Sequence, residues 1–211
     1  MMDVLGKRRA APRALAALAA AFLLAGCHAQ WTLDHQDFSA KSLPPLNFTL
    51  TDADTGKTVT AADFRGKTVM LFFGYTNCQD VCPLTLTDTT RIFHIIGPEA
   101  KNIRFLFVTV DPRRDTLPVL RRYTAEFDAK NIIGMRGSPA ELSAVAARYH
   151  ASYTVHPSPD PAKYDVTHTA EIYVFNRQGK PQFIIAGLAT KHPDLNGIAR
   201  DLRHIVAADK P

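Results

Sequence analysis

The sequence predicts an α/β fold in which a central mixed sheet is flanked by helices. Two continuous apolar runs, residues 67–73 and 103–110, have the composition of strands that are buried on both faces. Segments with apolar residues at helical spacing alternate with these runs and with a later hairpin pattern. An all-β protein and a helical bundle are both excluded, because neither accommodates strands and helices that alternate along one chain.

The first half of the chain predicts three strands and one helix. Residues 48–50 form a short strand that leads into the turn sequence TDADTG. The strand over residues 67–73 is bounded by glycines, and apolar residues after Pro83 predict a helix that ends near Gly97. The run at residues 103–110 is a second buried strand, which an Asp-Pro pair closes.

The second half of the chain predicts three helices and a hairpin. Apolar residues recur at helical spacing over residues 116–127, and the sequence SPAE at Ser138 is a capping box that opens another helix. Residues 170–175 and 183–186 flank the turn sequence NRQGK, which is a hairpin signature. A last helix covers residues 195–208. Two parallel strands joined by a helix, with an antiparallel hairpin and a final helix, make up the thioredoxin-like arrangement.

Residues 1–26 have the features of a lipoprotein-type signal peptide. Four basic residues precede an apolar run at residues 14–24, roughly half the ~20 residues that a membrane-spanning helix needs. The run ends in Leu-Ala-Gly-Cys, which resembles the bacterial lipobox, so we expect cleavage before Cys27 and a lipid on its thiol. Residues 27–45 then form a tether and residues 46–211 the folded domain. The alternative is an uncleaved anchor helix followed by a spare cysteine.

Cleavage at this site leaves a domain of modest charge on the oxidising side of a bacterial membrane. Residues 1–26 hold four basic residues and one acid, so the formal net charge falls from +5 to +2. No basic stripe remains in the sequence to indicate a nucleic-acid partner. The remaining chain, about 185 residues, is long enough for one α/β core.

Two of the three cysteines lie in the sequence NCQDVCP, between the first buried strand and the helix that follows. Proline is favoured at the first helical position and pushes the residue before it out of the α region. We therefore expect Pro83 to open the helix and Cys82 to be its N-cap. Unpaired backbone N–H groups and the positive end of the helix dipole favour a thiolate there, while Asp80 opposes it. The net expectation is a lowered pKa for Cys82.

This cysteine pair permits three kinds of chemistry. A structural disulfide suits an exported protein, but so small a loop removes little entropy from the unfolded chain. Catalytic thiol–disulfide exchange more often uses a C-x-x-C spacing, whereas three residues separate these thiols. Metal binding needs a further ligand, and two thiolates with one imidazole suit Cu(I) or Cu(II).

The chain has eight histidines from which a third ligand could come. Three of them, His150, His156 and His168, lie in or next to loops, whereas the others belong to the tether, the first helix or the C-terminal region. His168 directly precedes a strand that should enter the sheet, and the start of a strand holds a side chain more firmly than a long loop does. Spacing alone leaves the choice among the three histidines open.

The motifs resemble those of the Sco/SenC family of thioredoxin-fold copper proteins over about residues 45 to 208. A lone C-x-x-x-C would be a weak signal, but the order in which these motifs occur is specific to that family. The matching motifs are Phe64-Arg65-Gly66-Lys67, Phe73-Gly74-Tyr75-Thr76, Cys78, Asp80-Val81-Cys82-Pro83, Val108-Thr109-Val110-Asp111-Pro112, Arg114-Asp115-Thr116 and Val166-Thr167-His168-Thr169.

The resemblance implies a copper site made of Cys78, Cys82 and His168, since family members bind copper through the matching residues. The two cysteines would also be a redox-active pair that can form a disulfide. Asp111 and Asp115 match acidic family positions near the site. Their alternative roles are structural, as a turn after the strand and as a helix N-cap.

The sequence departs from the family pattern beside the first cysteine. The family has histidine before that cysteine and proline after it, where this chain has Asn77 and Gln79. Neither change removes a ligand. Losing the proline alters the stiffness of the loop and frees a backbone N–H near the sulfur, so the family's copper affinity and reduction potential do not carry over to this chain. The family's tether is often a transmembrane helix, whereas here the sequence indicates a lipid on Cys27.

The resemblance also implies a function. We expect a copper metallochaperone that delivers copper to, or prepares the thiols of, the binuclear copper site of cytochrome c oxidase. Its partners would be the copper-site subunit of that oxidase and a periplasmic thiol reductant or copper donor, and the chain would face the periplasm on its lipid anchor. The alternative is a membrane-anchored thiol–disulfide oxidoreductase, so enzymatic activity stays open. Copper sensing is a further alternative, and the sequence lacks the active-site signature of a peroxide-scavenging enzyme.

Overall fold

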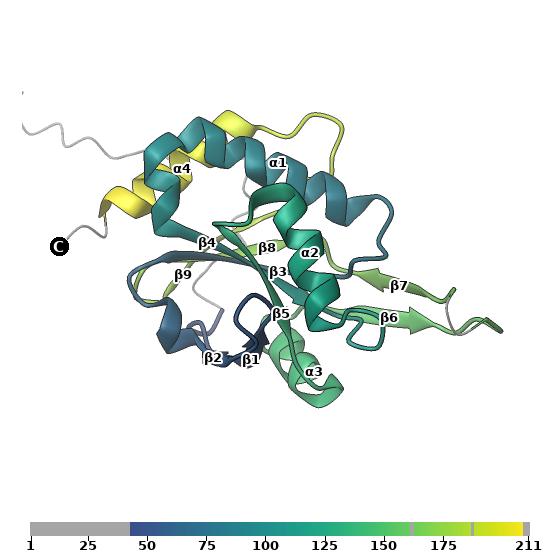
Figure 1. Cartoon of the computed structure of the whole chain (residues 1–211). Coiled ribbons are helices and arrows are strands. Elements are labelled where there is room, and N and C mark those ends of the chain that lie inside the picture. Colours follow the sequence, from purple (N-terminus) through teal and green to yellow (C-terminus); the bar gives the residue numbers. More distant parts are fainter. Residues whose placement is uncertain (1–42, 161–162, 187, 209–211) are drawn as a thin grey trace, which may run out of the picture. The chain divides into compact units, whose positions relative to one another are not determined.

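A seven-stranded mixed sheet runs through the domain in the order β2-β1-β5-β4-β3-β8-β9 (Figure 1). Strands β3, β4 and β5 are parallel, whereas β1 pairs with β5, β8 with β3 and β9 with β8 in antiparallel fashion. The short strand β2 closes one edge of the sheet against β1. The seven strands are β1 (Thr49–Asp52), β2 (Thr58–Thr60), β3 (Thr68–Gly74), β4 (Ile103–Thr109), β5 (Ile132–Arg136), β8 (Ile172–Phe175) and β9 (Pro181–Ile185).

The computed structural model describes residues 43–160, 163–186 and 188–208. These residues all fall within one unit of the chain, Thr32–Pro211. The expected signal peptide (residues 1–26), Cys27, on which a lipid is expected, and all but the last three residues of the tether lie outside the described residues. In the part of the chain that is described, no helix combines the length and the apolar composition needed to cross a membrane.

Helices cover both faces of the sheet. Side chains of α1, α2 and α4 pack with Met70, Phe72 and Phe105 on one face, and α3 packs with residues such as Leu71 and Val108 on the other. Figure 1 shows this division into layers. The helices are α1 (Val81–Ile96), α2 (Leu117–Asp128), α3 (Pro139–Arg148) and α4 (Leu195–Ala208), with the short 3₁₀ helices η2 (Ala61–Phe64) and η3 (Gly97–Asn102).

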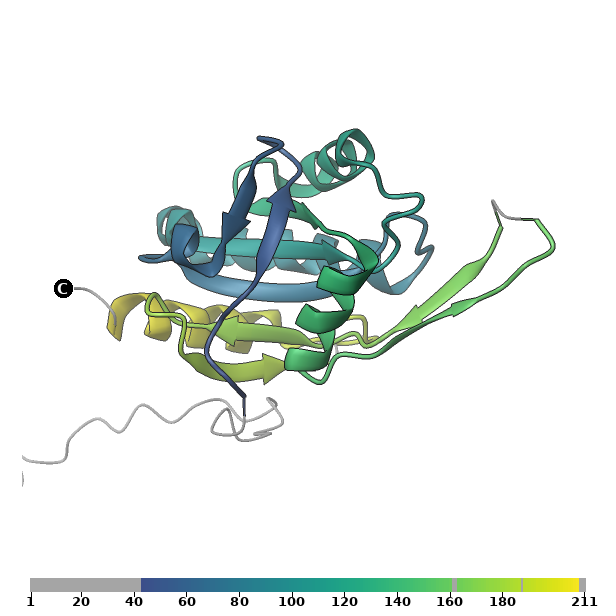
Figure 2. The same ribbon diagram turned by 90° about the horizontal axis from the view of Figure 1, so that it is seen from below.

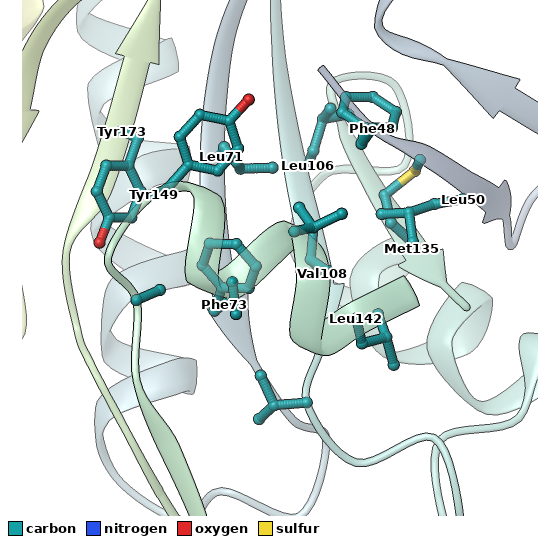
Figure 3. Close-up of a cluster of buried hydrophobic side chains, with 14 of the residues drawn as sticks. Phe48, Leu50, Leu71, Phe73, Leu106, Val108, Met135, Leu142, Tyr149 and Tyr173 are labelled. Carbon is teal, nitrogen blue, oxygen red and sulfur yellow. The ribbon is translucent and has the colours of Figure 1, made fainter. Parts of the chain in front are cut away.

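Among the described residues, the hydrophobic core consists of two clusters, one on each face of the sheet. On the α3 face, Phe48 and Leu50 belong to the same buried cluster as β-strand side chains such as Leu106 and as Tyr149 (Figure 3). The hydroxyl of Tyr149 accepts a hydrogen bond of 2.8 Å from the backbone N–H of Asn47, which fixes that segment to the end of α3. Leu43 already belongs to this core. Within the described residues both core clusters lie between Leu43 and Val206, and a compact unit with its own hydrophobic core is the kind that can fold alone, so we expect Thr32–Pro211 to do so.

A second, two-stranded sheet extends beyond the edge of the main one. It consists of β6 (Tyr153–His156) and β7 (Asp165–His168), which pair in antiparallel fashion with Tyr153 opposite His168 and His156 opposite Asp165. We call it the β6–β7 ribbon; Figure 2 shows it projecting from the rest of the domain. His168 therefore stands at the end of the ribbon that joins the main sheet, four residues before β8.

The predicted fold class is confirmed, and so are most of its elements. Both apolar runs form strands whose residues are nearly all buried, and the last helix spans Leu195–Ala208, as the sequence predicted. The capping box of α3 is also present, with Ser138 accepting from the backbone of Glu141. The sequence did not predict β2, β5 or the β6–β7 ribbon.

Candidate metal centre

The carboxyl end of β3 meets the ribbon at the three residues that the family resemblance selected. Cys78 lies in the loop between β3 and α1, Cys82 in the first turn of α1, and His168 at the end of β7. Their ligand atoms, two Sγ and one imidazole nitrogen, all lie within 4.8 Å of one another. The Nε2 atom of His168 is 3.4 Å from the Sγ of Cys82, although 86 residues separate them in sequence. His150 and His156, which the sequence left open, are exposed and lie outside this group.

Cys82 is not the N-cap of α1, so that prediction was wrong. The helix begins at Val81 with Asp80 as its N-cap, which places Cys82 second and Pro83 third in the helix. Proline fits anywhere in this first turn because the N–H groups there have no intrahelical acceptor, so Pro83 did not fix the first residue of the helix. The Cys82 side chain points inward instead and is 0% exposed.

The predicted lowering of the Cys82 pKa was wrong for the same reason. Burial away from water raises the pKa of the Cys82 thiol, and the neighbouring Cys78 sulfur raises it further. Any thiolate at this position would need a metal ion or another cation to stabilise its charge.

Cys78 instead receives the stabilisation that the helix N-terminus provides. Its sulfur accepts a hydrogen bond of 3.4 Å from the backbone N–H of Cys82, in the place of a helix-capping oxygen. The pKa of Cys78 is lowered to about 3, chiefly by a hydrogen bond from the Cys82 side chain and also by His168 and backbone N–H groups, while burial opposes the shift. The half-buried Cys78 is thus the thiolate of the pair.

The ring of His168 is oriented by its own strand end and by two aromatic side chains. Its Nδ1 lies 2.9 Å from the backbone oxygen of Thr169, and since a carbonyl only accepts, we assign the proton to Nδ1. The lone pair of Nε2 then lies on the side of the cysteines. Phe72 and Tyr75 meet the ring in edge contacts, with centroids 5.8 Å and 5.7 Å away. A histidine with one nitrogen held by a carbonyl and a lone pair on the other is arranged as metal ligands commonly are.

Gly74 makes room for the buried sulfur. A Cβ at this position would lie 2.8 Å from the Sγ of Cys82 and 2.8 Å from ring atoms of Phe72 and Phe107. These neighbours are themselves fully buried, so none of them can turn out into solvent to make room. Glycine at the end of β3 is therefore a requirement of the site and not of the strand.

Asp115 holds the cysteine loop through Thr76 and is not one of the possible ligands. It is 0% exposed and accepts hydrogen bonds from the hydroxyls of Thr76 and Thr109, each 2.6 Å long, and from the backbone N–H of Thr76 at 3.1 Å. The helix N-cap is the next residue, Thr116, so Asp115 does not have that structural role. Burial raises its pKa even though these hydrogen bonds lower it.

Asp111 ties the ribbon to the loop after β4. It accepts hydrogen bonds from the hydroxyl of Tyr164 and, at 2.5 Å, from the Nε of Arg114. Arg114 also donates to the backbone oxygen of Tyr164 at 2.9 Å, and its guanidinium lies 3.7 Å from the centre of that ring. Sequence reasoning did not identify Tyr164, because nothing in its neighbourhood marks the ribbon as structured. Neither Asp111 nor Asp115 belongs to the group of possible metal ligands.

The chain is similar to known proteins over most of its length. The SCO1/SenC family model matches residues 39–206. A bovine (Bos taurus) mitochondrial SCO2 homologue is 33% identical over 135 residues, which are 63% of this chain and 50% of that protein. Protein SenC of Rhodobacter capsulatus is 33% identical over 124 residues, 59% of this chain and 55% of that protein. The chain thus spans about half the length of the curated relatives it matches.

The fold is also similar to solved structures. Bradyrhizobium japonicum ScoI, solved with copper bound, has a TM-score of 0.68 and 34% sequence identity, covering 76% of this chain and 98% of that one. That agreement includes the thioredoxin-like mixed sheet on which the three ligands are assembled. With a family model that matches most of its length and a fold that agrees with a solved member, this chain belongs to the SCO1/SenC family.

Proposed function

We propose that this chain is a copper metallochaperone for cytochrome c oxidase, which binds copper through Cys78, Cys82 and His168. It would deliver copper to the binuclear site of the oxidase or prepare the thiols of that site, as membership of the SCO1/SenC family implies. The observation that carries the proposal is the convergence of two sulfurs and one imidazole nitrogen within 4.8 Å.

The donor set fits copper better than magnesium, calcium or structural zinc. Two sulfurs and one imidazole are soft ligands, which select copper over the two hard cations. Structural zinc takes four protein ligands, and no fourth His, Cys, Asp or Glu joins this group among the described residues. ScoI of B. japonicum, a relative of the same fold, was solved with copper bound.

The geometry also favours release of the ion to a partner. Cys78 and His168 are only half-buried, so ligands of a partner protein can reach the ion from their side. Binding requires deprotonated sulfurs and a neutral imidazole, and oxidation of the two cysteines to a disulfide would remove both sulfur ligands. Copper loading would therefore depend on the reduction state of the pair.

We further propose that the protein works on the periplasmic side of a bacterial envelope membrane. The support is the sequence of residues 1–26 and the lipobox-like Leu-Ala-Gly-Cys, which together indicate export and a lipid on Cys27. The copper-site subunit of the oxidase and a periplasmic thiol reductant or copper donor are the partners that fit this location.

The test is anaerobic copper titration of the reduced domain, residues 32–211. We expect one copper per chain, and a large loss of affinity in His168→Ala. His156→Ala is the matched control, because His156 is an exposed histidine of the same ribbon whose Nε2 lies 3.1 Å from the hydroxyl of Thr167. Equal affinity in the His168 variant and the wild type would contradict the proposed site.

A thiol–disulfide oxidoreductase is the second candidate, and one observation favours it. Cys78 is a half-buried thiolate beside a buried thiol, which is the arrangement of an attacking and a resolving cysteine. Exchange with a disulfide substrate would use both sulfurs and would not need His168 as a ligand. Weak copper binding that is equal in the wild type and in His168→Ala, together with rapid thiol–disulfide exchange, would establish this second function instead.

A further inference from the structure

Seven basic side chains lie along the edge of the sheet opposite the metal centre. They come from the segments before β3 and β5, from the start of β4 and the residues before it, and from the turn between β8 and β9. They therefore share the end of the sheet at which the parallel strands begin. We call this set the basic edge; it consists of Arg65, Lys67, Lys101, Arg104, Lys130, Arg177 and Lys180.

Contacts between these segments make the basic edge one continuous surface. The Nζ of Lys67 donates to the backbone oxygen of Lys101 at 3.0 Å, and the Nη1 of Arg104 donates to the same oxygen at 3.1 Å. The backbone N–H of Gly66 donates to the backbone oxygen of Arg177 at 3.0 Å, which joins the β8–β9 turn to the start of β3. Burial lowers the pKa of Lys67, and the charges of Arg104, Arg177 and Lys101 lower it further. The positive charges of these four side chains therefore lie close enough together to repel one another.

Part of the basic edge is hollowed into a pocket of about 570 Å³. Lys101, Arg104 and Lys130 line it, and within the described residues none of the three forms an ion pair. Asp128 also lines the pocket, but its oxygens accept from the side chain of Asn131 and from nearby backbone N–H groups. The lysine charges thus remain available to an anionic partner.

The described part of the chain begins at this same edge. The backbone N–H of Leu46 donates to the backbone oxygen of Gly179 at 2.8 Å, inside the turn that carries Arg177 and Lys180. Leu46 is the fourth described residue, so the start of the described part of the chain lies beside the basic edge. The metal centre stands at the other end of β3, a strand of seven residues, or about 20 Å of rise.

We propose that the basic edge docks onto a membrane surface that carries anionic phospholipid headgroups, so that the metal centre faces away from the membrane. The inference rests on the proposed attachment of the chain through Cys27. Charges spread over four segments suit an extended anionic surface, and a chain anchored on the same side would bring that surface to them.

The test measures binding of the unlipidated domain, residues 32–211, to vesicles by co-sedimentation. Vesicles of phosphatidylcholine alone are compared with vesicles that contain one third phosphatidylglycerol, at low and at about 0.3 M salt. The test variant is Lys101→Gln/Lys130→Gln/Lys180→Gln, and the matched control is Arg122→Gln/Lys191→Gln/Arg200→Gln. All six side chains are exposed, and both variants lose the same charge.

We expect the wild type and the control to bind anionic vesicles alone, and salt to weaken the binding. A lysine at an anionic surface contributes about fivefold to binding, so the test variant should bind roughly 100-fold more weakly. Equal loss in both variants, or equal binding to neutral vesicles, would overturn the proposal.

Two further measurements distinguish this proposal from binding of a soluble anion and from the proposed copper function. Tripolyphosphate binding that the test variant loses, without any vesicle binding by the wild type, would assign the basic edge to a soluble anion and overturn the membrane proposal. Copper titration of the same three proteins should give equal affinities. If none of them binds copper while the vesicle results hold, the proposed function fails and the docking surface stands.

Discussion

The backbone N–H of Cys82 donates a hydrogen bond to the sulfur of Cys78, at a distance of 3.4 Å. The residue that the helix N-terminus stabilises is thus four positions earlier in sequence than the helical cysteine itself. This relationship divides the pair into a half-buried thiolate, Cys78, and a buried thiol, Cys82.

The first prediction concerns thiol reactivity in the reduced, metal-free domain. Since the pKa of Cys78 is lowered to about 3, its thiolate is fully formed at any pH above about 5. Alkylation by iodoacetamide should therefore modify Cys78 at the same rate at pH 6 and pH 8. The rate of an ordinary thiol, with a pKa of about 8.5, would instead rise roughly tenfold for each unit of pH increase in this range. Stopped-flow alkylation with peptide mass mapping measures both site and rate.

The control is Cys82→Ala. The hydrogen bond from the Cys82 side chain is the largest cause of the Cys78 shift, so its removal should raise the Cys78 pKa and make alkylation slower at pH 6 than at pH 8. A wild-type rate that already climbs steeply between these values would show that the sulfur is not a thiolate.

The second prediction concerns the space beneath the metal centre. Gly74→Ala adds a methyl group within 2.8 Å of the Cys82 sulfur, so the sulfur must move or the ring atoms of Phe72 and Phe107 must. Such overpacking costs about 1–3 kcal/mol in the free energy of unfolding. We expect that loss in urea denaturation, together with weaker copper binding by the variant.

Gly134→Ala serves as the comparison. Its new Cβ would meet the Cβ atoms of Leu120 at 3.0 Å and Ala53 at 3.3 Å, away from the ligands. It should lower stability and leave the copper affinity unchanged. If both variants weaken copper binding equally, the effect belongs to general destabilisation and not to the Cys82 sulfur.

The third prediction concerns the pH dependence of stability. Burial raises the pKa of Asp115 above its ordinary value of 3.8, so the folded state holds this proton more tightly than the unfolded state does. Its stabilising contribution is complete below pH 3.8 and is lost as the pH rises through the raised value. The free-energy difference between the wild type and Asp115→Asn should therefore shift in favour of the wild type as the pH falls from 7 to 4, in urea titrations at each pH.

The exposed carboxylate of Asp63 should show the opposite pH dependence of stability. Hydrogen bonds from the backbone and side chain of Thr60 lower the pKa of Asp63, so its contribution is present above pH 3.8 and is lost on further acidification. Asp63→Asn should accordingly show a shift in the reverse direction. The same direction in both variants would refute the assignment for Asp115.

The fourth prediction concerns the contact that ties the ribbon down. Tyr164→Phe removes the hydroxyl that donates to the buried Asp111 and should lower the free energy of unfolding by about 1.5–3 kcal/mol, the range for hydrogen bonds to charged groups. Because Val166 and His168 follow directly in β7, we also expect weaker copper binding.

Tyr153→Phe is the matched control on the facing strand, since the Tyr153 hydroxyl makes no hydrogen bond within the described residues. Its unfolding free energy and copper affinity should stay close to those of the wild type. Equal loss in the two variants would indicate that the ribbon depends on both tyrosine hydroxyls and not on the contact with Asp111 in particular.

The sequence predicted those elements whose pattern is set by burial alone. Strands β3 and β4 lie in the middle of the sheet and are covered on both faces, so their apolar runs are continuous. Strand β5 was missed because its five residues include a central glycine and a terminal arginine. Its place in the sheet comes from pairing with β4 and β1, which local sequence does not reveal.

The site was predicted in composition but not in detail. The family motifs selected Cys78, Cys82 and His168, and the structure brings these three together. The helix start was wrong by two residues, and with it the roles of the cysteines, because proline is compatible with several positions in a first turn. The ribbon that carries His168 was missed because β6 and β7 are only four residues long and mostly exposed. Their sequences therefore lack the regular apolar pattern that packing against a core imposes.

The unequal burial of the two sulfurs sets an order of events for the proposed transfer. The Cys82 sulfur is 0% exposed beneath Gly74 and two phenylalanine rings, whereas Cys78 and His168 stand on the open side. If copper is bound here as proposed, an incoming thiolate would reach it from that side, so Cys78 or His168 would be displaced before Cys82. Transfer would then have a defined last step, in which the buried Cys82 sulfur is the final ligand to release the ion.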